Sequence, residues 1–377
     1  AARTAGLASL VRVAALQALG RVAGSGLWPI LAQVAPLTRD SDAAVRSAAV
    51  IALAALAPAG GGQVLGLLMG TAGSLEEVLG PGEETIAAPA LDAGAPAAPC
   101  LGSVRDPEWE VRLAAVEGLR SLAPRGEAQA CRTLVLATAD ERSEVRALAC
   151  RALGIVAQIG DEEAMRVLIE RCVDASFEVR HAALPTLGAL AALPEGGRTV
   201  RAAVRACLES WESAIRDREL RHLALDTAVG LVGLNNQDVV KTLAKSLESE
   251  LEETRAAAAD GLAAVAEGED GFLAKQIVRR IIDDRPPVRR DALALFCRLV
   301  APGNETAVEA LISHCDKPDP GVRIAVVEAL RHAAKRGDTE AAAELLGCLK
   351  DKEPRIRAAT LVAIAEIAPY NDDSYVT

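Results

Sequence analysis

A short phrase returns along this chain at a fixed spacing. Its clearest copy runs from Asp140 to Arg146 as Asp-x-x-x-x-Val-Arg and leads into a run rich in alanine and leucine. Successive copies of the arginine lie 34 residues apart, with one step of 41 residues. The copies are Arg112, Arg146, Arg180, Arg221, Arg255, Arg289, Arg323 and Arg357, and upstream Arg12 and Arg46 are again 34 apart. Such a period is typical of stacked repeats rather than of a domain with one central core.

Each period reads as two amphipathic helices. Residues 162–173 place apolar side chains three or four positions apart, which is the spacing of one helical face. Residues 174–176 interrupt that pattern with capping groups, and residues 179–190 resume it. Neither helix could bury its apolar face alone, so the core must form between stacked units. We therefore predict an all-α fold, an α-solenoid of stacked antiparallel helix pairs.

Two interruptions of the period set the predicted boundaries. Residues 58–105 are rich in Gly, Pro and Ala, and read either as a degenerate repeat or as an insertion. Seven additional residues between Arg180 and Arg221 indicate a longer loop or helix. The chain opens inside a repeat, so we expect its native N-terminus and any targeting peptide to lie upstream. The expected parts are residues 1–57 with a truncated first repeat, the segment 58–105, a continuous array at 106–369 and a tail at 370–377.

The charge and cysteine content exclude several classes of function. A net charge of −11 disfavours nucleic acid and anionic membranes as partners, because both attract basic surfaces. No apolar stretch is long enough for a transmembrane helix. The eight cysteines form no CxxC pair and have no metal-ligand spacing to a histidine, so we predict neither a metal nor a cofactor. Reduced thiols indicate an intracellular, reducing compartment, either cytoplasm or an organelle interior.

The repeated phrase resembles the HEAT repeat of the armadillo-like superfold. Its alanine-rich form with Ala-Leu-Gly, as in residues 151–154, is most similar to the HEAT-like repeats of the phycobilisome-lyase type. The resemblance implies a right-handed superhelix and a hydrogen-bonded Asp–Arg ladder between neighbouring units. The matching residues are Asp40, Arg46, Asp106, Arg112, Asp140, Arg146, Asp174, Arg180, Asp283, Arg289, Asp316, Arg323, Asp351 and Arg357. Before Arg255 the aspartate is missing, and Glu250 or Ser249 would have to substitute for it.

The ladder residues are predicted to be structural and not catalytic. A carboxylate at a helix start satisfies free N–H groups, and a guanidinium carries enough donors to bridge two units. By the same resemblance, the second helix of each unit lines the concave face. Positions 1, 5, 8 and 9 residues after each ladder arginine should then face outward and form a groove of mixed charge. Mixed surfaces of this kind suit a protein or peptide partner.

Nine residues are candidates for partner binding on this face. Trp109 stands at the start of a second helix, where it could anchor a partner or pack on the neighbouring degenerate segment. The histidines among the candidates occupy one column, but a metal site would need further ligands. The candidates are Trp109, Glu117, Arg151, His181, His222, Asp226, Asp260, Arg290 and Glu328.

We predict a non-catalytic scaffold or adaptor that presents its second helices to a protein partner, as a subunit of a larger assembly. The alternative is a phycobilin-lyase-like enzyme or a tetrapyrrole chaperone, which the repeat style allows. Eight aromatic residues in 377 offer little for a tetrapyrrole pocket. The chain has no GxSxG, Walker A or Rossmann motif, and it lacks the His-Glu pairs of the iron-dependent hydroxylases built from HEAT repeats. We therefore predict no catalytic residue.

Overall fold

The chain is described by a computed structural model in which every regular element of the described residues is a helix. Its helices fall into two compact units, residues 1–210 and residues 211–377, and the boundary lies inside helix α11 (Arg198–Ser213). The structure describes residues 2–22, 28–57, 62–69, 103–191, 198–214, 217–267 and 270–368.

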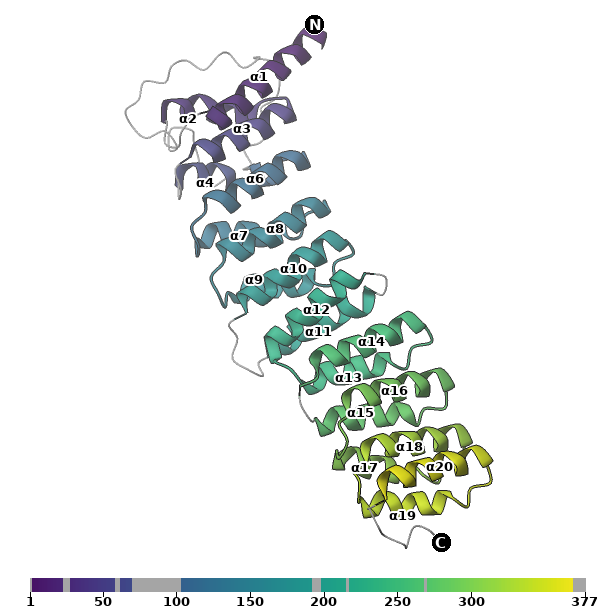
Figure 1. The fold of residues 1–377 in the computed structure, drawn as a ribbon. Coiled ribbons are helices and arrows are strands. Elements are labelled where there is room, and N and C mark those ends of the chain that lie inside the picture. Colours follow the sequence, from purple (N-terminus) through teal and green to yellow (C-terminus); the bar gives the residue numbers. More distant parts are fainter. Residues whose placement is uncertain are drawn as a thin grey trace. The chain divides into compact units, whose positions relative to one another are not determined.

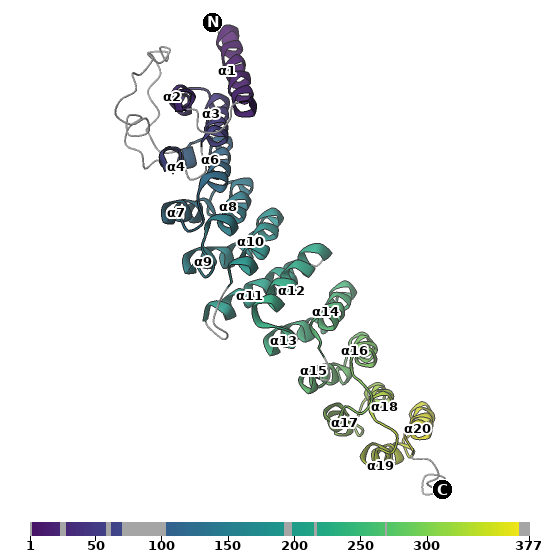
Figure 2. The ribbon, with the colours of Figure 1, turned by 60° about the vertical axis from the view of Figure 1, so that its left-hand side comes forward.

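The first unit consists of two rows of helices that alternate along the chain (Figures 1 and 2). We call them the first row and the second row. The first row contains α2 (Trp28–Val34) with the short helix η1 (Ala35–Arg39), then α4 (Gly62–Met69), α7 (Ala128–Ala137) and α9 (Glu162–Arg171). The second row contains α1 (Ala2–Val22), α3 (Ala43–Leu56), α6 (Trp109–Leu122), α8 (Ser143–Val156) and α10 (Phe177–Leu190).

The second unit repeats this arrangement. Its first row contains α13 (Gln237–Ser246), α15 (Gly271–Ile281), α17 (Glu305–Ile312) and α19 (Thr339–Cys348). Its second row contains α12 (Arg218–Val232), α14 (Glu252–Val265), α16 (Pro286–Leu299), α18 (Pro320–Ala333) and α20 (Pro354–Ile367). The predicted α-solenoid of paired helices is confirmed.

The predicted interruptions fall partly outside the described residues. Within 58–105, the structure describes α4 and the short helix η2 (Ser103–Arg105), and the remaining residues of that segment lie outside the description. The tail at 370–377 lies outside it as well. The second interruption contains α11, which spans residues 198–213. With 16 residues, α11 is longer than each helix of the first row.

The amino-acid sequence explains where the helices begin. The first-row helices α9, α13, α15, α17 and α19 start at residues whose side chains accept a main-chain N–H, as Asp161 does from Ala164 at 2.9 Å. Second-row helices α16, α18 and α20 begin with proline, which has no N–H to leave unsatisfied in a first turn. The residue before the ladder arginine is fully buried in copies such as Val145 and Val179.

Glycines at the turns between repeats join neighbouring units through main-chain atoms. Gly126 adopts a φ of 87°, and its N–H donates to the carbonyl of Val156 at the end of α8, at 2.7 Å. Gly160 has a φ of 84° and donates in the same way to Leu190, the last residue of α10, at 2.8 Å. Only glycine adopts such a φ without steric cost. These bonds tie the C-terminal end of each second-row helix to the repeat before it.

Candidate functional site

The ladder arginines connect the N-terminal ends of successive second-row helices. Each uses one terminal nitrogen to bind two carbonyl groups of its own turn, five and six residues earlier. In the regular copies, the other two nitrogens bind both oxygens of the aspartate in the following repeat. The regular pairs are Arg46 with Asp106, Arg112 with Asp140, Arg146 with Asp174, and Arg323 with Asp351.

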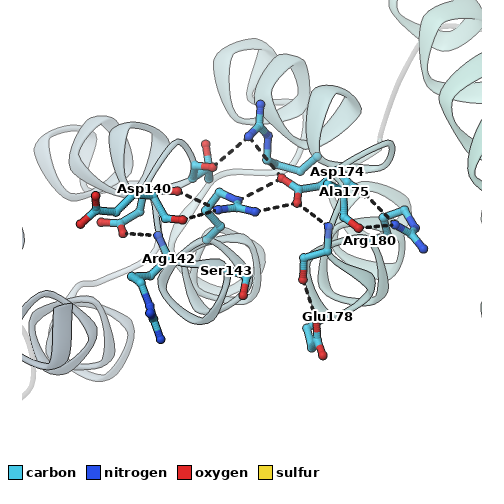
Figure 3. A network of polar contacts seen from close by, with 12 residues as sticks. Asp140, Arg142, Ser143, Asp174, Ala175, Glu178 and Arg180 are labelled. Carbon is cyan, nitrogen blue, oxygen red and sulfur yellow. Dashed lines mark hydrogen bonds and ion pairs between the residues drawn. The ribbon is translucent and has the colours of Figure 1, made fainter.

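Arg146 shows the geometry (Figure 3). Its Nη1 donates to the carbonyl oxygens of Asp140 at 2.9 Å and Glu141 at 3.1 Å. Its Nε and Nη2 donate to the two carboxylate oxygens of Asp174, at 3.0 and 2.8 Å. Asp174 also accepts the N–H of Ser176 at 2.9 Å, at the start of α10. One side chain thus fixes the start of its own helix against the start of the next.

The electrostatics of the pair favour the ionised aspartate. Burial by itself would raise the pKa of Asp174, whose side chain is 6% exposed. The hydrogen bonds from Arg146 and from the Ser176 amide outweigh burial, so the pKa of Asp174 lies below its usual value. The hydrogen bond from Arg323 lowers the pKa of Asp351 in the second unit. Both carboxylates are therefore charged under neutral conditions.

The ladder departs from the predicted residues in the second unit. Arg255 binds the carbonyls of Ser249 and Glu250 at 3.0 Å each, so these residues supply main-chain oxygens and not the missing carboxylate. Its carboxylate partner is Asp291 in α16, at 2.7 Å, while Asp283 pairs with Arg285.

A second departure concerns the next rung. Arg289 lies 2.9 Å from Asp319, and not against Asp316. Arg180, at the end of the ladder in the first unit, binds the carbonyls of Asp174 and Ala175 at 2.7 and 3.2 Å. Among the described residues, no carboxylate pairs with the Arg180 guanidinium. Arg180 therefore binds the carbonyls of its own turn without an ion pair to a following repeat.

An open groove runs across the second-row helices of the first unit. It has a volume of about 740 Å³ and crosses α3, α6, α8 and the start of α10. Small residues of these helices, Ser47, Ala114 and Ala147, line it together with the apolar Ile51, Leu113 and Leu148. Its charged lining consists of Glu110, Glu117, Glu144, Glu178 and Arg151. Four carboxylates against one guanidinium make the lining acidic, where the sequence predicted mixed charge.

Three of the predicted candidates meet in this groove. Trp109 begins α6, is half-buried, and has the guanidinium of Arg142 stacked 4.7 Å from the centre of its ring. Glu117 pairs with Arg120 at 2.5 Å, and Arg151 is exposed on α8. Trp109 therefore lines the groove, and the cation–π contact with Arg142 holds its ring in place.

The other candidates lie elsewhere. His181 is half-buried on α10 with its ring 5.4 Å from that of Phe177, and it does not line the groove. In the second unit, His222 accepts a hydrogen bond from Arg218 at 3.3 Å on α12, and Asp226 is exposed on the same helix.

The remaining candidates carry local ion pairs or none. Arg290 pairs with Asp291 at 2.9 Å, and Asp260 lies 3.6 Å from Arg298. Glu328 is exposed on α18. None of these residues contributes to the groove.

Sequence reasoning missed most of the acidic lining. Glu110, Glu144 and Glu178 each stand two residues before a ladder arginine, as the first residue of the triplet Glu-Val-Arg. The glutamate before the Val-Arg pair carries little signal by itself. Acidic residues are common in the first turn of a helix, where they interact favourably with the helix dipole. The same 34-residue spacing was the signal that could have found them.

The described part of the chain also bears on metal binding, membrane crossing and cysteine chemistry. Within those ranges, no three His, Cys, Asp or Glu side chains come together in a way that suits a metal ion. No described helix combines the length and the apolarity that crossing a bilayer requires. The described cysteines, residues 131, 150, 172, 207, 297, 315 and 348, are free thiols.

Three stretches of the chain match the family model of HEAT repeats. The first two, residues 97–188 and 132–221, overlap, and the third is residues 275–365. Together they cover more than half of the 377 residues. The chain belongs to the HEAT-repeat family. Its paired helices are HEAT repeats, as the Asp-x-x-x-x-Val-Arg phrase predicted. The narrower resemblance to phycobilisome-lyase repeats stays a prediction.

Solved structures with HEAT-like arrangements resemble this chain at low identity. An engineered protein is 18% identical, with 95% of each chain covered and a TM-score of 0.36. Human deoxyhypusine hydroxylase is 21% identical over 70% of this chain and 93% of its own, with a TM-score of 0.28. A chain from a structure of Kap95p with RanGDP is 13% identical over 91% of this chain and 46% of its own, with a TM-score of 0.46. No curated protein matches the sequence.

Proposed function

We propose that this HEAT-repeat protein is a non-catalytic scaffold that binds a segment of a partner protein in the groove over α3, α6, α8 and α10, within a larger assembly. The observation that carries the proposal is the groove itself. It combines exposed apolar side chains with charged ones across four consecutive repeats. Protein interfaces have this composition, with an apolar or aromatic centre and a polar rim.

The shape of the groove supports a polypeptide rather than a small molecule. Ile51 is 53% exposed in it, and Arg151 and Glu178 are exposed at its edges. Sites for small molecules are usually enclosed and bury most of the ligand surface. A surface that stays open along several helices fits a ligand that extends beyond it, as a protein segment does.

The two inter-repeat connections keep the groove in one shape. The Arg–Asp pairs hold the starts of α6, α8 and α10 together, and the glycine N–H groups hold the ends of α8 and α10. A partner that binds a preformed surface loses less free energy to ordering of that surface than it would on a mobile one. The ladder thus serves binding indirectly, by fixing the distance between the helices that line the groove.

The test is capture of the partner from the native source with matched variants. The groove variant Ile51→Ser with Trp109→Ser removes the two largest apolar surfaces of the site. The control variant Leu136→Ser with Ile159→Ser makes similar changes at residues that are 63% and 58% exposed outside the groove. Hot-spot residues contribute about 2 kcal/mol or more each, so we expect the affinity of the groove variant for the partner to fall about thirtyfold for each residue substituted. Equal capture by both variants, with unchanged circular dichroism, would exclude this groove.

A further inference from the structure

The glutamates at the groove form a regular column. Glu110, Glu144 and Glu178 occupy the first turns of α6, α8 and α10, at one position in three successive repeats. All three are exposed, and all three line the groove. Because the repeats are stacked, the carboxylates form a row that crosses the helices.

Neighbouring groups favour the charged form of two of these carboxylates, Glu144 and Glu178. The hydrogen bond from its own main-chain N–H and the nearby Arg142 guanidinium lower the pKa of Glu144. The hydroxyl of Ser176 donates to Glu178 at 2.6 Å and lowers its pKa. In the described residues, no side chain pairs with the carboxylate of Glu110.

Two arginines near the column already pair with carboxylates of the groove. Arg142 lies on the Trp109 ring and bonds Glu144 at 3.1 Å. Arg120 is paired with Glu117 at 2.5 Å. Arg151 is exposed, and within the described ranges no ion pair involves it. With Glu117 and Glu144 balanced by those two paired arginines, Glu110 and Glu178 face Arg151, so the lining keeps one negative charge in excess, which complements a basic ligand.

The spacing of the column selects a backbone conformation. Stacked helices lie about 8–10 Å apart, so successive glutamates should recur at about that interval. A polyproline II segment repeats every three residues over about 9 Å, whereas side chains on one face of a β-strand recur after about 7 Å. An α-helix laid along the column would carry about twice as many residues over the same length, which is too bulky for a groove of about 740 Å³.

Apolar side chains also line the groove, and a bound segment could contact them. Leu113 and Leu148 lie on neighbouring helices, and the Trp109 ring stands at the same edge as Glu110. Aromatic surfaces of this kind are what proline-rich segments bind in other recognition modules. An apolar residue after each basic one would reach them.

We infer that the groove binds an extended segment of polyproline II conformation that carries lysine or arginine at every third position, with proline or other apolar residues between. The inference rests on the proposed scaffold function and names the class of partner. Three basic side chains would meet Glu110, Glu144 and Glu178 in register. Arg151 would oppose such a ligand, because its charge has the same sign.

The test uses fluorescence anisotropy with two labelled nonapeptides of equal composition. In one, Lys-Pro-Leu is repeated three times. In the other, the three lysines are adjacent and followed by the same proline and leucine residues. We expect the spaced peptide to bind about tenfold more tightly, and its affinity to fall as salt rises. Equal affinities would overturn the predicted register.

Variants of the full chain locate the binding. Neutralising Glu110, Glu144 and Glu178 together to glutamine should weaken the spaced peptide by about tenfold to a hundredfold, because each exposed pair contributes a factor of about two to five. Neutralising Glu162, Glu163 and Glu170 on α9 changes the net charge equally and should leave affinity unchanged. Arg151→Gln should tighten binding by about twofold to fivefold.

The outcomes separate this inference from the scaffold proposal. Wild-type affinity in the triple groove variant, or equal weakening in the α9 control, would overturn the assignment of a basic ligand to this column. If the native partner is still lost from the Ile51→Ser, Trp109→Ser variant in that case, the scaffold proposal stands and only the partner class fails. If capture is also unaffected, both fail.

Discussion

The contribution of the ion pair between repeats to the free energy of unfolding can be measured, because one ladder arginine, Arg180, has no such pair among the described residues. Arg146 binds two carbonyls of its own turn and both oxygens of Asp174. Arg180 binds the corresponding carbonyls of Asp174 and Ala175, and no described carboxylate. Substituting either arginine by alanine removes the same side chain from the same position of a repeat. The difference between the two variants therefore isolates the pair with the next repeat.

The magnitude follows from burial and from the partners left behind. The side chains of Arg146 and Asp174 are 14% and 6% exposed, so the pair is close to fully buried. Breaking a buried pair costs about 3–5 kcal/mol. Asp174 keeps Arg171 at 3.4 Å, which places Arg146→Ala near 3 kcal/mol. Two carbonyl contacts from one nitrogen predict about 1–2 kcal/mol for Arg180→Ala.

The assay is urea denaturation followed by circular dichroism, with hydrogen exchange to place the loss. Repeat proteins can unfold in parts, so exchange at α8 and α10 is needed beside the global transition. We expect Arg146→Ala to lose about 1–2 kcal/mol more than Arg180→Ala, and to speed exchange in both helices. An equal loss in the two variants would refute the claim that the pair joins neighbouring repeats energetically.

Three further predictions concern acid, turns and thiols. Asp174→Asn should destabilise the protein at neutral pH in urea denaturation, and this difference should shrink as pH falls below about 4 and vanish below the folded-state pKa. A carboxyl group whose pKa is lowered by folding contributes its full stability above the unfolded value of about 3.9, and loses it as pH falls through the folded value. Gly126→Ala should cost about 1–2 kcal/mol at its φ of 87°, whereas Gly230→Ala, with open space around it on α12, should gain about 0.5–1 kcal/mol in thermal unfolding. At pH 8, a thiol reagent followed by mass spectrometry should label the exposed Cys297 well before Cys150, since burial raises the pKa of Cys150 to about 12.

The period of 34 residues was enough to predict the fold, because a stacked repeat imposes the same requirements at each copy. The positions three and seven residues after the ladder arginines had to fit a buried core. Ala149 and Leu153 are fully buried accordingly, and so is Thr360, which is three residues after Arg357. The start of the second-row helices could also be predicted, since an aspartate there accepts the N–H two residues later, as Asp140 does from Arg142. These features are local, and local patterns are visible in a sequence.

The pairing in the second unit could not be predicted in the same way. Arg255 binds Asp291, which lies 36 residues later and outside the repeated phrase, because a guanidinium can reach any carboxylate that the next helix presents nearby. Likewise Asp319, at the start of α18, reaches Arg289 although the phrase pointed to Asp316. Such choices depend on side-chain reach in three dimensions.

The groove depends on side-chain size at several helices together. Ser47 and Ala147 leave room where larger residues would fill the surface, and Trp109 and Ile51 border that room. Three residues that line the groove, Trp109, Glu117 and Arg151, were among the candidates predicted from the sequence to face outward. Asp226, Asp260 and Glu328, at equivalent positions of the second unit, do not line this groove.

The most direct measurement is carbodiimide cross-linking of the captured complex, mapped by mass spectrometry. The reagent joins carboxylates to lysines, and residues 1–210 contain no lysine, so amine cross-linkers would leave the first unit silent. We predict cross-links from Glu110, Glu144 and Glu178 to lysines of the partner, with lysines three residues apart joined to successive glutamates. A partner whose lysines join carboxylates of residues 211–377 and none of these three would contradict the account.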